Sequence, residues 1–289
     1  MIFKKPIVIA EIGCNHKGDF GIALELIKLA NDCGADVAKF QKRNSRELLT
    51  EEQFNAPHPN PSHAYGATYG EHRDNLEFSL DQHRELKKFS ESIGISYSTS
   101  VWDQKSALEI ISISPEFIKV PSACNNNFSM LHLLRDQYDG DVHVSTGMTT
   151  HIEIESIVSF FEEKEQANRL IIYSCTSGYP VPFADVCLLE ITNLKSKYSN
   201  RVKDIGFSGH HLGIAIDVAA YALGSVWIER HFTKDRTWKG TDHAASLEPP
   251  GMSKLVRNLM ATQEAMQFKE KEILDIEEVQ REKLKYRKA

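Results

Sequence analysis

The chain has 289 residues, a formal net charge of −6, and a composition that is 41% hydrophobic and 26% charged. These values are typical of a folded globular protein and exclude a disordered or fibrous chain, and the mild acidic excess argues against a nucleic-acid binder. No apolar run approaches the ~20 residues that a membrane span needs, and the five cysteines lack the CxxC spacing of a zinc site. We therefore expect a cytoplasmic protein without nucleic-acid or membrane partners.

Short apolar, β-branched runs alternate along the chain with longer amphipathic segments. The first run reads as a buried strand and not as a signal peptide, because Glu11 interrupts its apolar residues. The predicted strands cover residues 7–12, 37–41, 95–100, 117–121, 142–146, 170–174, 204–207 and 226–232. The predicted helices cover residues 20–33, 80–93, 104–112, 128–138, 151–163, 185–195, 214–223 and 253–269.

This alternation predicts an α/β fold, a closed (β/α)8 TIM barrel. A doubly wound open sheet is the alternative, but no GxGxxG motif follows the first strand. Residues 43–79 form a long polar insertion after the second strand, as lids and binding loops do. We expect the catalytic barrel to span residues 1–270 and residues 271–289 to form a charged helical tail or linker remnant.

Polar and charged residues occupy the end of almost every predicted strand. In a barrel of this kind the chemistry lies at the carboxyl ends of the strands. Burying such side chains is costly unless they are paired or used, so their number indicates a ligand site. The residues concerned include Glu11, Lys39, Gln41, Lys119, Ser122, Ser145, Tyr179, Ser208, His210 and His231.

His210 and His231 end the predicted seventh and eighth strands, which are neighbours. Two imidazoles so placed can converge on one divalent cation and leave positions open for water or substrate. Without a thiolate nearby, we expect Mn²⁺, with Mg²⁺ or Co²⁺ as alternatives. The competing interpretation is a pair of hydrogen-bonded core histidines. His211 must point away from His210, because side chains alternate along a strand.

Lys39, Lys119 and the serines at the strand ends suggest an anion pocket for a phosphate or a carboxylate. The alternative is that one lysine forms a Schiff base with a carbonyl substrate. Asp242, on the loop after the last strand, can accept from a metal-bound water or a sugar hydroxyl, or it can be a turn residue.

Eight segments carry these residues in chain order: IAEIGCNHKGD, VAKFQK, TYGEHRDNLEFS, FIKVPSACNNN, HVSTGMTT, SCTSGYPVP, GFSGHHLGIAI and ERHFTKDRTWKGTDHAASLEP. Together they resemble the sialic acid synthase (N-acetylneuraminate synthase) family over residues 5–260. The resemblance implies condensation of phosphoenolpyruvate with an aldose, N-acetylmannosamine or a similar sugar or its 6-phosphate. The products would be a 2-keto-3-deoxy sugar acid and phosphate.

The resemblance also implies roles for individual residues. His210 and His231 would bind the metal, and Lys39, Lys119, Ser122, Ser145 and Ser208 would hold phosphoenolpyruvate. Glu11, Gln41, Tyr179 and Asp242 would face the sugar or metal-bound water. The expected catalytic residues are Glu11, Lys119, Cys124 and Asp242.

Cys124 departs from the family pattern, which usually has Glu or Asp two residues after the serine of the fourth-strand motif. A thiol is a poor substitute for an anionic carboxylate at neutral pH. Either Glu11 or another group at the rim then activates water, or the acceptor and the chemistry differ.

The end of the sequence is the second departure. Family members continue into a small antifreeze-like β-domain, and we expect that domain to be missing because the sequence ends at Ala289. A homodimer would then form through the barrel or the charged tail. Two other functions stay open, a Schiff-base pyruvate aldolase and a non-catalytic barrel that binds a sugar or phosphoenolpyruvate.

Overall fold

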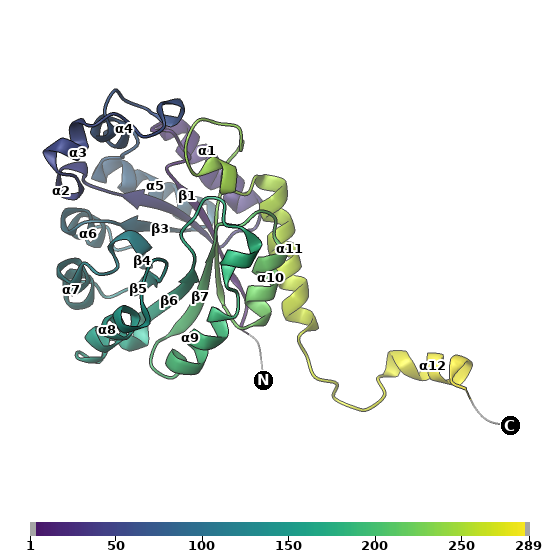
Figure 1. The fold of residues 1–289 in the computed structure, drawn as a ribbon. Coiled ribbons are helices and arrows are strands. Elements are labelled where there is room, and N and C mark those ends of the chain that lie inside the picture. Colours follow the sequence, from purple (N-terminus) through teal and green to yellow (C-terminus); the bar gives the residue numbers. More distant parts are fainter. Residues whose placement is uncertain (1–3, 287–289) are drawn as a thin grey trace.

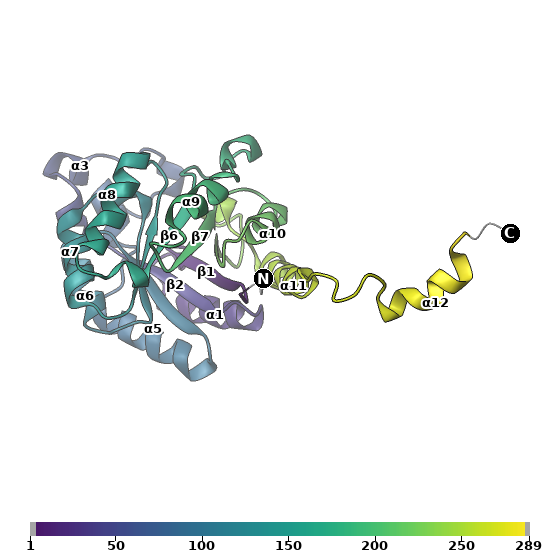
Figure 2. The same ribbon diagram turned by 90° about the horizontal axis from the view of Figure 1, so that it is seen from below.

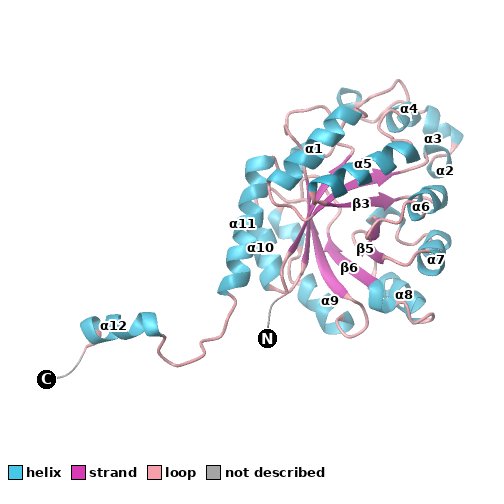
Figure 3. Cartoon of the chain, turned by 180° about the vertical axis from the view of Figure 1, so that it is seen from behind, coloured by secondary structure: helices cyan, strands magenta, loops and turns pink. Residues whose placement is uncertain are grey.

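The computed structural model describes residues 4–286, and its eight parallel strands close into one barrel in sequence order (Figure 3). The predicted (β/α)8 fold is thus confirmed, and every strand end lies within two residues of its predicted position. The strands are β1 (Ile7–Gly13), β2 (Val37–Lys42), β3 (Ser96–Val101), β4 (Phe117–Val120), β5 (Asp141–Ser145), β6 (Leu170–Cys175), β7 (Asp204–Gly209) and β8 (Trp227–His231).

Helices surround the barrel on its outside (Figure 2). The first begins where the Asp19 side chain accepts a hydrogen bond from the Ile22 amide, and its Ala23, Leu26 and Ile27 are buried. These helices are α1 (Phe20–Asp32), α5 (Leu80–Ile93), α6 (Gln104–Ile111), α7 (Phe128–Gln137), α8 (His151–Glu162), α9 (Glu190–Tyr198), α10 (Ala215–Ala222) and α11 (Pro249–Ala265).

Two helices differ from the prediction by three to five residues at each end, and their starts show why. Helix α9 begins at Glu190 instead of residue 185, because a 3₁₀ turn (Phe183–Val186) comes first and Cys187 has a φ of +49°. Helix α11 begins at Pro249 instead of residue 253. Proline suits the first turn of a helix, where its missing N–H needs no partner.

The polar insertion after β2 contains three short helices, α2 (Ser45–Leu48), α3 (Glu51–Asn55) and α4 (Tyr69–Asp74). It meets the loop between β8 and α11. The Tyr65 hydroxyl donates to the Lys239 carbonyl, and the Gly240 amide donates to His63 Nδ1 over 3.2 Å. The insertion therefore reaches the loop after β8 along the rim above β1, and its role as a lid stays a prediction.

The barrel interior has an apolar half and a polar half. The apolar half is a buried cluster of Ile9, Val37, Phe117, Ile171, Tyr173 and Trp227. Except for Tyr173, these residues lie in the amino-terminal half of their strands, and together they form the apolar base of the barrel interior. Polar side chains from the carboxyl half of the same strands are left facing the space above it.

Helix α12 (Asp275–Leu284) lies apart from the barrel in Figure 1 and buries no residue. The domain boundary at residue 270 stays a prediction, and its outer limits, residues 1–3 and 287–289, fall outside the described residues. None of the helices described between residues 4 and 286 combines the length and apolar character needed to cross a membrane.

Candidate active site

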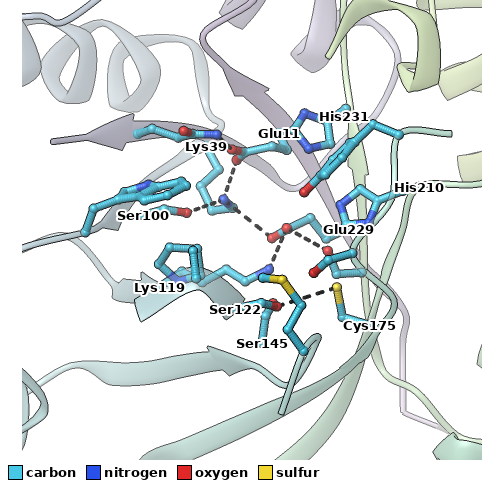
Figure 4. Close-up of a pocket in the computed structure, with 18 residues that line it drawn as sticks. Glu11, Lys39, Ser100, Lys119, Ser122, Ser145, Cys175, His210, Glu229 and His231 are labelled. Carbon is cyan, nitrogen blue, oxygen red and sulfur yellow. Dashed lines mark hydrogen bonds and ion pairs between the residues drawn. The ribbon is translucent and has the colours of Figure 1, made fainter. Parts of the chain in front are cut away.

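A pocket of about 360 Å³ opens at the carboxyl ends of the strands (Figure 4). The structure brings ten of the twelve predicted site residues to its wall: Glu11, Lys39, Gln41, Lys119, Ser122, Ser145, Tyr179, Ser208, His210 and His231. Cys124 and Asp242 do not line it. Ser100 and Cys175, at or directly after the ends of two predicted strands, line it too, and so do Glu229 and Trp102, which sequence reasoning missed.

Four buried charges alternate across the pocket floor. Lys39 Nζ pairs with Glu11 and lies 3.6 Å from Glu229 Oε2, and Lys119 Nζ lies 2.5 Å from Glu229 Oε1. Because Glu11 and Lys39 are register partners on β1 and β2, their pairing follows directly from the sheet. The two lysines are therefore neutralised by two carboxylates, and the floor is electrically balanced (Figure 4).

Glu229 links this cluster, since it accepts from Lys119 and from the Ser208 hydroxyl at 3.1 Å. Burial disfavours its ionised form, but the Lys119 and Lys39 ammonium groups outweigh burial and hold the pKa of Glu229 below its ordinary value. Glu229 is two residues before His231, so strand alternation puts both side chains on the inner face. That spacing was the signal that could have predicted it.

The hydroxyl groups expected in the anion pocket lie around the lysines. Ser100 Oγ accepts from Lys39 Nζ at 2.7 Å, and Ser122 Oγ accepts from the Gly147 amide at 3.0 Å. Cys175 Sγ lies 3.8 Å from Ser122 Oγ. A small anion entering here meets ammonium, hydroxyl and amide donors together, but it must share the lysines with Glu11 and Glu229.

The two histidines predicted to bind metal face each other, with ring centroids 5.4 Å apart. His210 Nδ1 lies 2.9 Å from the Thr176 carbonyl, which fixes that nitrogen as the donor and leaves Nε2 as a lone-pair ligand. Burial, reinforced by the neighbouring His231, lowers the pKa of His210 to about 3, so its imidazole is neutral at pH 7.

His231 Nδ1 is buried without a hydrogen bond and lies 3.9 Å from Asp242 Oδ2. Within residues 4–286 no group of three or more His, Cys, Asp or Glu side chains could hold a metal. His210 Nε2 and the buried His231 Nδ1 are the two nitrogens that could bind an ion here. Such an ion would take two imidazole ligands from the protein and its other ligands from substrate and water.

Cys124 is buried beside the pocket and not in its wall, with Sγ 4.0 Å from the Val101 carbonyl. Burial raises the pKa of its thiol to about 12, and Asp103 adds to that effect. The thiol is therefore neutral. This geometry does not support the expectation that Cys124 contacts the reacting atoms, because its side chain packs in the buried core beside the pocket.

A second buried ion cluster lies behind the wall, between β8 and α10. Arg230 Nη1 lies 2.6 Å from Asp217 Oδ2, and both side chains are fully buried. Arg230 also donates to the carbonyls of His211 and Gly213 at 2.6 and 2.8 Å. His211 points into this cluster, away from His210 as predicted, and the cluster holds the loop that carries His210.

Fold and site together define a (β/α)8-barrel enzyme with a charged pocket at the carboxyl end of its strands. The sequence profile of the NeuB family matches residues 26–271. The chain belongs to the NeuB family.

Its relatives include sugar acid synthases. Human N-acetylneuraminate-9-phosphate synthase is 39% identical over 279 residues, which cover 96% of this chain and 76% of the human one. N,N'-diacetyllegionaminic acid synthase of Campylobacter jejuni is 32% identical over 264 residues, and this match covers 91% of this chain and 78% of the Campylobacter chain. The N-acetylneuraminic acid synthetase of Leptospira borgpetersenii, solved with citrate, superposes with a TM-score of 0.82 at 30% identity. That match covers 98% of this chain and 94% of the other.

Proposed function

We propose that the protein condenses phosphoenolpyruvate with an N-acetylmannosamine-like aldose or its 6-phosphate to give a sialic-acid-like 2-keto-3-deoxy sugar acid and phosphate. One observation carries the proposal. A cluster of two lysines and two carboxylates lies in the same pocket as a facing imidazole pair, in a chain of the NeuB family.

Phosphoenolpyruvate would bind over the floor of the pocket. Lys39 and Lys119 would hold its carboxylate and phosphate, with the hydroxyls of Ser122, Ser145 and Ser208 as further donors. These groups come from separate strands of a rigid barrel, so they fix the plane of the enol before the acceptor arrives.

The aldose would bind above, with its aldehyde at His210 and His231. The two imidazoles would hold a divalent ion, which would supply Lewis-acid polarisation of the aldehyde oxygen. Gln41 Nε2 donates to Glu11 Oε1 at 3.0 Å and so orients this carboxylate. Tyr179, whose ring centroid lies 4.3 Å from that of His210, would close the side of the acceptor site.

Carbon–carbon bond formation then proceeds from C3 of the enol to the aldehyde carbon, which leaves positive charge at C2. The anionic Glu229, kept ionised by its lysine partners, would stabilise that charge. Water adds to C2 and gives its proton to Glu11, the other carboxylate in the wall. The C2–O bond to phosphate breaks, and the departing phosphate takes the proton of the remaining C2 hydroxyl, which becomes the ketone. The proton held by Glu11 passes to the former aldehyde oxygen, which becomes a hydroxyl.

Mn²⁺ is our proposal for the ion, with Mg²⁺ or Co²⁺ as alternatives. A homodimer and a cytoplasmic location stay predictions. Asp242, whose Oδ2 lies 3.9 Å from His231 Nδ1, would accept a hydrogen bond at the rim from a sugar hydroxyl or a metal-bound water.

The test is phosphate release by the purified protein with phosphoenolpyruvate, Mn²⁺ and a panel of five- and six-carbon aldoses. We expect phosphate and a 2-keto acid in equal amounts, loss of both with EDTA, and recovery on adding Mn²⁺. A Schiff-base aldolase would instead label Lys39 or Lys119 with pyruvate and borohydride. A non-catalytic barrel would bind phosphoenolpyruvate and release no phosphate with any aldose.

A further inference from the structure

Arg73 of the lid helix α4 is a cation without an anionic partner beside the pocket. No hydrogen bond or ion pair involves its side chain among residues 4–286, and its guanidinium lies 5.5 Å from the ring centroid of Trp102 and 5.3 Å from that of Tyr69. Trp102 lines the pocket. Arg43 also approaches Trp102, at 5.7 Å, but its Nε is paired with Glu77 at 2.5 Å.

The position of Trp102 relative to the reacting end of the pocket is decided by barrel closure. Trp102 directly follows β3, whereas His210 directly follows β7. Strands four apart in a closed eight-stranded barrel lie on opposite sides. An open-chain sugar that binds with its aldehyde at His210 and extends across the pocket would bring its far end towards Trp102 and Arg73.

The charge balance of the pocket makes Arg73 a cation that is available to a further anionic group. The floor is balanced, with two lysines against two carboxylates, before any substrate binds. A further anionic group needs positive charge elsewhere, and Arg73 supplies it.

We propose that Arg73, held against Trp102, binds a terminal phosphate on the acceptor sugar and makes the enzyme selective for the phosphorylated aldose. This inference rests on the proposed function. Phosphoenolpyruvate contributes three carbons, so C9 of a nine-carbon product is C6 of the acceptor. The human relative is named as a synthase of the 9-phosphate, which agrees with a phosphate at this end. A guanidinium suits it, because its forked donors match phosphate oxygens.

The experiment compares kcat/KM for N-acetylmannosamine 6-phosphate with that for N-acetylmannosamine, in the wild type and in Arg73→Met. The wild type should prefer the phosphorylated sugar. The ratio of the two kcat/KM values should fall about tenfold to hundredfold in the variant, the range expected for charge-assisted hydrogen bonds. Arg73→Lys keeps the positive charge but loses the forked donors of the guanidinium, so the ratio of the two kcat/KM values should fall less than in Arg73→Met.

Arg46→Met is the matched control, because Arg46 lies in the same insertion, pairs with Glu51, and stacks on Phe54, which does not line the pocket. Its ratio should equal that of the wild type. Lys239→Met tests a rival cation on the opposite loop, which stacks on Tyr65.

The proposal is overturned if the wild type does not prefer the phosphorylated sugar. It is also overturned if Arg73→Met lowers both kcat/KM values equally, or if Lys239→Met and not Arg73→Met lowers the ratio. In each of these cases phosphate release persists and the proposed function stands. Failure of that function is a separate result, in which no aldose supports phosphate release by the wild type.

Discussion

Lys119 Nζ lies 2.5 Å from Glu229 Oε1, although the two residues are 110 positions apart in the chain and belong to β4 and β8. These strands lie on opposite sides of the closed barrel. Their side chains therefore meet across its interior, where both are buried. This ion pair joins the floor of the pocket to the strand that carries His231.

Replacing Glu229 with Gln should lower the free energy of unfolding by about 3 kcal/mol at pH 7, because the Lys119 ammonium loses its buried counter-charge. The pKa of Glu229 is held below its ordinary value, so its contribution is complete above about pH 4.3. It is lost as the pH falls further, through the folded-state pKa. Urea denaturation at several pH values checks this. The difference in the free energy of unfolding between wild type and Glu229→Gln should become smaller below about pH 4.3. A difference that becomes larger there would contradict the role of Glu229 as an ionised partner of Lys119.

Replacing His210 or His231 with Ala should weaken Mn²⁺ binding about 100-fold or more, because each supplies one of two protein ligands. Loss of the free Mn²⁺ electron paramagnetic resonance signal on titration measures binding without reference to turnover. The control is His132→Ala, an exposed histidine that pairs with Asp136 on α7. Equal Mn²⁺ affinity in all four proteins would show that the imidazole pair is structural.

Breaking the buried pair behind the wall should cost far more stability than breaking an exposed one. Arg230→Met removes the permanent positive charge beside the fully buried Asp217 and leaves it only His211 Nε2, at 3.3 Å, so we expect a loss of about 3–5 kcal/mol. Arg84→Ala removes an exposed pair with Asp81 and should cost about 0.5 kcal/mol or less. Urea midpoints at pH 7 measure both. Similar losses in the two variants would mean that the Arg230 network does not anchor the loop after β7.

Cys124→Ser should change the rate of phosphate release by no more than about twofold, because the thiol is neutral and lies outside the pocket wall. Glu11→Gln, by contrast, removes a carboxylate that lines the pocket, and a lost general base costs about 10²–10⁴-fold in rate. Steady-state phosphate release compares the two variants. A large loss of the rate of phosphate release in Cys124→Ser would show that the thiol contributes to the reaction.

Local patterns were sufficient for the order of strands and helices. Residues 7–12 and 20–33 differ in the spacing of their apolar side chains, and this spacing survives in any tertiary context. The two helix starts that were wrong, at Glu190 and Pro249, depend on one left-handed residue and on a proline turn. Such boundaries depend on single residues, which the repeat of apolar side chains does not reveal.

The sequence by itself determined the barrel, and it placed lysines, serines and the two histidines at strand ends, because strand order and side-chain alternation follow from neighbours along the chain. Only the tertiary structure decided which charges pair. Closure of the sheet sets Lys119 against Glu229, excludes Cys124 from the wall and lays Arg73 on Trp102. Contacts between distant segments depend on how strands and loops meet in space, and no periodicity along the chain encodes that.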